Sequence, residues 1–123
     1  MPIEYNYDKK NNFLYEIGSG DISLDDFIAF RKELKTVNLR ADFKCLANYL
    51  DARVMFRFDE MWNVGHETIN IAKDHGNVKL AICAKEGLGT AMAKEFRIIA
   101  GKNDLQIEVF SSIDQGRKWL DKD

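Results

Sequence analysis

Three short strand-like runs, each followed by a segment with helical periodicity, constrain the fold of this chain most strongly. The runs are "FKCLANYL" (residues 43–50), "VKLAICA" (78–84) and "LQIEVF" (105–110). The first two are apolar on both alternating faces, as expected of strands covered by helices on both sides. Helical patterns follow over about 59–74, 90–100 and 111–120. This alternation predicts a parallel sheet with helices on both faces.

The N-terminal segment has a different pattern. Residues 3–7 alternate apolar and polar, "DKKNN" is a polar turn, and residues 13–18 read as a second strand, so an antiparallel hairpin opens the chain. Ser23, with Asp26 three residues later, predicts the start of a helix that runs to about residue 37. We therefore predict an α/β fold, with one mostly parallel five-stranded sheet, an opening antiparallel hairpin and about four helices.

Composition restricts the class of protein. At 123 residues, with 46% hydrophobic and 31% charged residues, we expect a single globular domain over residues 1–123. The formal net charge of −2, without a basic stripe, argues against a nucleic-acid partner. Neither an apolar leader nor a membrane-spanning run is present in the sequence, so we expect no membrane insertion and a cytoplasmic location.

Several strings resemble one known family. They are "YDKKNNFLYEIGSGDISLDDF", "ANYLDAR", "VKLAICA" and "IEVFSSIDQGRKWL". Together with the order of elements, they are similar to the SpoIIAA-like family, the STAS domains (sulfate transporter and anti-sigma factor antagonist) and their SEC14-like relatives. The resemblance implies this scaffold and leaves the activity open. We predict a non-enzymatic binding or regulatory module that acts through protein–protein association at the carboxyl edge of the sheet. Anti-sigma antagonists carry a phosphorylated serine after the central strand, but no Ser, Thr or Tyr occurs here between Leu50 and Glu67.

The cysteine and histidine residues, which commonly act in catalysis or bind metals, do not have the spacing of a catalytic or metal-binding motif. Cys45 and Cys83 lie far apart in apolar runs, which predicts buried reduced thiols. His66 and His75, nine positions apart, lack the spacing of a metal-binding pair. We therefore predict no catalytic residue, no metal site and no cofactor. An enzyme remains the open alternative, and it would use Asp51 and Arg53, together with His66.

The segment "GLGTAM" (87–92) follows a strand and opens a helix, so a dinucleotide-binding loop has to be considered. Met92 stands at the third glycine position and is too bulky for close helix–strand packing. A lone anion at this helix N-terminus is the better hypothesis. Its predicted site consists of Lys85, Gly87, Gly89 and Thr90.

An unusual cluster of large apolar residues follows the central strand, in "LDARVMFRFDEMW" (50–62). Its members are Val54, Met55, Phe56, Phe58, Met61 and Trp62. With Asp51 and Arg53, they form our predicted ligand or partner site at the carboxyl edge of the sheet. We weigh three interpretations: a surface for a protein partner or a second copy in a homodimer, the wall of a pocket for a small apolar ligand such as an acyl chain, as the SEC14-like resemblance suggests, and ordinary core.

Overall fold

The fold is seen in a computed structural model, which describes residues 2–101 and 104–122. One sheet contains the strands β1 (Ile3–Asp8), β2 (Phe13–Ile22), β3 (Lys44–Val54), β4 (Val78–Ala84) and β5 (Leu105–Phe110). The helices are α1 (Leu24–Leu34), α2 (Met61–Ala72), α3 (Leu88–Ala100) and α4 (Ile113–Leu120), and a short 3₁₀ turn, η1 (Phe58–Glu60), precedes α2. In the part of the chain described, no helix has the length and apolar character needed to cross a membrane.

The strands lie in the order β1-β2-β3-β4-β5. β1 pairs with β2 antiparallel, and every other neighbouring pair is parallel. The predicted mixed sheet with an opening hairpin is therefore confirmed. β3 occupies the centre, as its apolar residues on both faces require.

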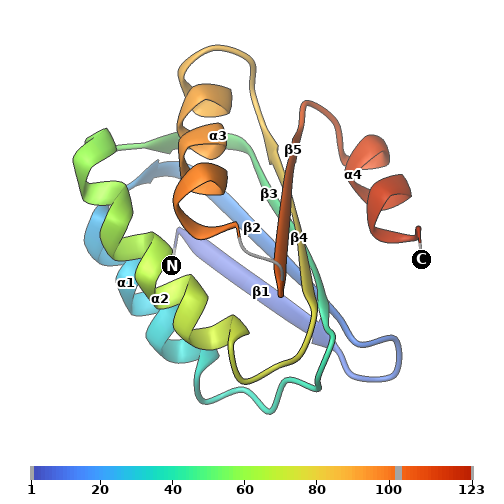
Figure 1. The fold of residues 1–123 in the computed structure, drawn as a ribbon. Coiled ribbons are helices and arrows are strands. Elements are labelled where there is room, and N and C mark those ends of the chain that lie inside the picture. Colours follow the sequence, from blue (N-terminus) through green and yellow to red (C-terminus); the bar gives the residue numbers. More distant parts are fainter. Residues whose placement is uncertain (1, 102–103, 123) are drawn as a thin grey trace.

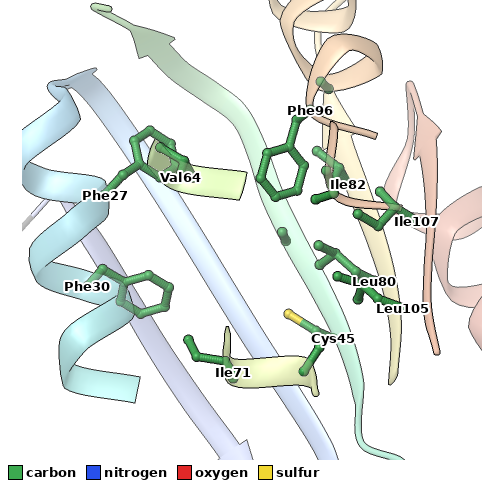
Figure 2. Close-up of a cluster of buried hydrophobic side chains, with 14 of the residues drawn as sticks. Phe27, Phe30, Cys45, Val64, Ile71, Leu80, Ile82, Phe96, Leu105 and Ile107 are labelled. Atoms are coloured by element: carbon green, nitrogen blue, oxygen red, sulfur yellow. The ribbon is translucent and has the colours of Figure 1, made fainter. Parts of the chain in front are cut away.

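The helices form two unequal layers on the sheet (Figure 1). α1, α2 and α3 cover one face, and α4 alone lies against β3, β4 and β5 on the other. The larger core cluster lies under the three helices, and Figure 2 shows its side chains between α1 and the strands. The smaller cluster, under α4, consists of Leu46, Ala81, Cys83 and Leu120. Cys45 and Cys83 are both buried and free, and they belong to different clusters.

The structure corrects the boundary of the central strand. We predicted that it ends at residue 50, but β3 continues to Val54. The reason is that β2 also continues to Ile22, so residues 19–22 pair in register with residues 51–54. The first part of the apolar cluster is thus strand rather than loop. Its side chains alternate, with Asp51, Arg53 and Met55 exposed.

Two helix starts can be compared with their predictions. Ser23 caps α1 as predicted, and its Oγ accepts a hydrogen bond from the Asp26 N–H at 3.1 Å. Thr90 was expected to cap the third helix, and this was wrong. Gly87, with φ of 98°, is the N-cap residue, because glycine adopts this backbone conformation without strain and the chain enters α3 earlier. α1 also ends at Leu34, short of the predicted residue 37.

The cap of α4 provides a test of local stability. Ser112 Oγ accepts a hydrogen bond from the Gln115 N–H at 3.2 Å, so we expect Ser112→Ala to lower the free energy of unfolding by about 1 kcal/mol. Ser111→Ala is the matched control, since Ser111 is exposed and is not the cap, and it should change stability by less than about 0.5 kcal/mol. Urea denaturation measures both. Equal losses in the two variants would contradict this assignment.

Candidate functional site

An apolar pocket of about 400 Å³ lies between the sheet and the three helices α1, α2 and α3. β3 and β4 form its floor, and the loops after these two strands reach its mouth. Phe27, Ile82 and Phe96, all lining residues, are seen in the upper half of the core in Figure 2. The pocket opens at the carboxyl ends of the parallel strands, where ligands bind in sheets of this kind.

Part of the predicted site lies in the wall of this pocket. Val54, Phe56 and Met61 come from the apolar cluster, Arg53 comes from the end of β3, and Lys85 and Gly89 come from the segment after β4. Phe56 packs edge-on against Phe27, with ring centroids 5.4 Å apart and an interplanar angle of 87°. This contact holds the Phe56 ring beside the pocket rather than in solvent.

The remaining apolar members of the cluster point elsewhere. Met55 is 54% exposed, Phe58 is 44% exposed and Trp62 is 56% exposed, and none of them lines the pocket. Phe58 and Trp62 are four positions apart in the continuous η1–α2 segment, so their side chains share one side of it. The cluster is therefore divided into residues of the pocket wall and three exposed apolar side chains, Met55, Phe58 and Trp62.

Arg53 forms its ion pair with a residue other than Asp51. Asp51 is exposed and stands opposite Ser19 in the register of β2 and β3. Arg53 instead forms an ion pair with Asp21 at 2.8 Å, and this hydrogen bond lowers the pKa of Asp21. Because both side chains are largely exposed, the pair orients Arg53 at the pocket mouth without adding much stability.

The four residues predicted to bind an anion are also divided. Lys85 and Gly89 line the pocket, whereas Gly87 and Thr90 face a second, open hollow bordered by Ser111 and Gln115. The Thr90 N–H donates to the Lys85 carbonyl at 2.9 Å, so this amide already has a partner within the chain. Anion binding at this helix end stays a prediction.

A buried polar network, which sequence reasoning missed, lies at the inner end of the pocket. Arg31 from α1 donates through Nη1 to Glu16 Oε1 of β2 at 3.3 Å and through Nε to Thr68 Oγ1 of α2 at 3.1 Å. Tyr49 of β3 donates its hydroxyl proton to Glu16 Oε2. Glu16 is 1% exposed and Arg31 is 5% exposed. The network thus joins two strands and two helices in the core.

The protonation states of this network follow from burial and from the Glu16–Arg31 pair. Burial is the largest single effect on Arg31 and disfavours its charged form, but the Glu16 carboxylate, together with Tyr49 and Cys45, outweighs burial and raises the pKa of Arg31. Burial, with the charge of Glu16, raises the pKa of Tyr49 well above its ordinary value. Tyr49 therefore keeps its proton at neutral pH and remains a hydrogen-bond donor to Glu16.

The sequence does contain a weak signal for this network. Glu16 follows Leu14 by two positions on β2, which places its carboxylate on the buried face of the strand. Arg31 lies four positions after Phe27 and three before Leu34, within the apolar stripe of α1. A charged residue of each sign on two facing apolar surfaces is the pattern expected of a buried ion pair.

Neither histidine is placed to bind a metal with other ligands. His66 is exposed beside Trp62, with ring centroids 6.2 Å apart. The Nδ1 atom of His75 lies 2.5 Å from the Ile71 carbonyl oxygen, and its ring packs on Phe43. Across residues 2–101 and 104–122, no three His, Cys, Asp or Glu side chains are grouped as metal ligands would be.

The buried pair makes a prediction about stability. Arg31→Met should lower the free energy of unfolding by about 3–5 kcal/mol, because it leaves the Glu16 carboxylate buried without its counter-charge. The double variant Glu16→Gln/Arg31→Met should recover most of this loss, since the pair is then neutral. Lys35→Met is the control, because it breaks the exposed ion pair with Glu67 and should cost less than about 1 kcal/mol. Denaturant unfolding tests this, and additive losses in the double variant would contradict it.

Comparison with known proteins extends the description of the fold. No family model and no curated protein matches the chain. Among solved structures, it is similar to an uncharacterised protein from the DUF3478 family with a SpoIIAA-like fold, from Shewanella loihica PV-4. The TM-score is 0.61 at 11% sequence identity, and the match covers 96% of this chain and 93% of that one. The chain therefore has a SpoIIAA-like α/β fold.

Proposed function

We propose that this chain is a non-enzymatic binding module whose pocket holds a small, largely apolar ligand. The observation that carries the proposal is the apolar pocket of about 400 Å³ at the carboxyl edge of the sheet. Small-molecule sites in proteins range from about 300 to 1,000 Å³, so this pocket suits a compact ligand. Removal of apolar ligand surface from water supplies the driving force for binding.

The composition of the wall supports a binding role. Apolar side chains from five elements form most of it, and a few charged groups, Arg53, Lys85 and Glu86, stand at its mouth. This combination of an apolar body with a few polar groups is typical of sites that bind and orient a small molecule. No Ser, Cys or His is found among the pocket residues in the described part of the chain, which disfavours nucleophilic catalysis there.

A neutral fluorophore tests whether the pocket binds. We expect N-phenyl-1-naphthylamine to bind with a blue-shifted, enhanced emission and a stoichiometry of one per chain. Ala93→Leu should weaken binding by about tenfold or more, because Ala93 of α3 lines the pocket and a larger side chain fills the volume the probe needs. Fluorescence titration measures both.

The matched control is Ala91→Leu, which makes the same change on the exposed side of the same helix, outside the pocket. It should leave the affinity for the probe unchanged. Absence of binding to the wild-type protein, or equal affinity in the Ala93→Leu variant, would contradict the proposed pocket function.

We also propose a second candidate function, self-association through the outer apolar surface of Met55, Phe58 and Trp62. The supporting observation is that three large apolar side chains, each at least 44% exposed, occur within eight positions of the chain. Large exposed apolar side chains at one place on a protein surface often mark an interface. Symmetric dimers are the commonest assembly of soluble proteins, so a second copy is the partner proposed.

Sedimentation velocity over a range of concentrations tests this second proposal. We expect the wild-type protein to form a dimer and Phe58→Asp to shift it to monomer, because a carboxylate at the interface would have to be desolvated. The control is Ile98→Asp on α3, where the side chain is 71% exposed and lies outside the proposed surface. A wild-type monomer at all concentrations, or equal dissociation by Ile98→Asp, would reject the proposal.

A further inference from the structure

The inner end of the pocket carries a side chain whose hydrogen-bonding capacity is only partly used. Arg31 is 5% exposed and belongs to the pocket wall. Its guanidinium has five N–H donors. Nε donates to Thr68 and Nη1 donates to Glu16. Within residues 2–101 and 104–122, Nη2 donates to no protein acceptor.

This nitrogen is not completely buried. Among the described residues, no fully buried side-chain nitrogen or oxygen lacks a hydrogen-bond partner. Nη2 is therefore not sealed in the core. Arg31 borders both the pocket of about 400 Å³ and a cavity of about 30 Å³, and of these two only the pocket has room for a ligand. A ligand that places an acceptor atom next to such a donor forms a hydrogen bond with it, and this bond stabilises the complex.

Arg31 lies far from the mouth of the pocket. Leu80 and Ala84 both line the pocket and are four positions apart on β4, a span of about 13 Å along the strand. Arg31 also borders a smaller cavity of about 30 Å³, together with Leu80 and core residues that do not line the pocket. It therefore marks the inner end of the pocket. A ligand that reaches Arg31 must therefore pass an extended apolar wall.

The charge around Arg31 determines which acceptor fits. Glu16 already balances the guanidinium charge, and the two Glu16 oxygens accept hydrogen bonds from Arg31 and Tyr49. A ligand carboxylate placed here would lie near the Glu16 charge in a medium of low dielectric constant, where like charges repel strongly. A neutral acceptor oxygen needs no further counter-charge, and it would satisfy Nη2.

We infer that the pocket binds a neutral, largely apolar molecule with a carbonyl oxygen at its inner end, such as a ketone, ester or amide. The carbonyl oxygen accepts a hydrogen bond from Arg31 Nη2, and the apolar body of the ligand lies along β4 toward the mouth. This inference rests on the proposed pocket function and adds the chemical class of the ligand.

Displacement of bound N-phenyl-1-naphthylamine by two ligands of equal chain length provides the test. In the wild-type protein, 2-decanone should displace the fluorophore at lower concentration than decanoate does. Arg31→Lys should weaken 2-decanone by about tenfold, as expected for one lost hydrogen bond to a charged donor. Lysine keeps a positive charge opposite Glu16 but lacks the second prong of the guanidinium. The fluorophore, which has no acceptor oxygen, should bind both proteins equally.

Arg97→Lys is the matched control, since Arg97 of α3 pairs with Glu108 and is not among the pocket residues, and it should leave the affinity for 2-decanone unchanged. If the fluorophore does not bind at all, the pocket function itself fails. If the fluorophore binds but decanoate is the tighter ligand, or Arg31→Lys does not weaken 2-decanone, the inference is overturned while the pocket function stands.

A spectroscopic measurement on the wild-type protein decides the matter if Arg31→Lys does not fold. The infrared carbonyl stretch of ¹³C-labelled 2-decanone should lie at lower wavenumber in the complex than in hexane, because a hydrogen bond from Nη2 weakens the C=O bond. An unshifted carbonyl band in the complex would overturn the inference.

Discussion

The buried ion pair between Glu16 and Arg31 is the interaction on which the arrangement of this protein depends. A carboxylate and a guanidinium in the core must balance each other's charge, because an unpaired buried charge is costly. Thr68 of α2 adds a hydrogen-bond partner for Arg31, and Tyr49 of β3 adds one for Glu16. Gly18 gives Tyr49 the room it needs, since a Cβ atom at Gly18 would overlap the Tyr49 ring. The pair therefore fixes how α1 and α2 sit on the sheet.

The pocket is a consequence of this layering. Three helices cover one face of the sheet, and at its carboxyl edge their side chains leave a hollow between α1, α2, α3 and the two central strands. The polar network lies at the inner end of that hollow. Arg53 of β3, with Lys85 and Glu86 of the loop after β4, lies at its mouth. An apolar body between two polar ends gives a bound molecule a defined direction as well as affinity. Met55, Phe58 and Trp62 come from the segment that also contributes to the pocket wall, but they are exposed and do not line the pocket.

The elements themselves were largely predictable, because their signals are local. The capped start of α1 at Ser23, and the buried strands β4 and β5, follow from side-chain chemistry and periodicity within a few residues. The end of β3 was not predicted, because Asp51 and Arg53 interrupt the apolar run and resemble a loop. Only pairing with the extension of β2 makes that segment a strand. Thr90 was mistaken for a cap because the backbone conformation of Gly87 is not visible in a list of residue types.

Local patterns in the sequence establish the class of fold and the order of its strands and helices along the chain. They also show more large apolar residues after the central strand than a connection between a strand and a helix needs. The tertiary structure decided which of those residues line a pocket and which face outward, because that division depends on strand register and on packing against α1 and α3. It also decided that Glu16 and Arg31 form a pair. Fifteen positions separate them along the chain, and only the packing of α1 on β2 brings their charges into contact.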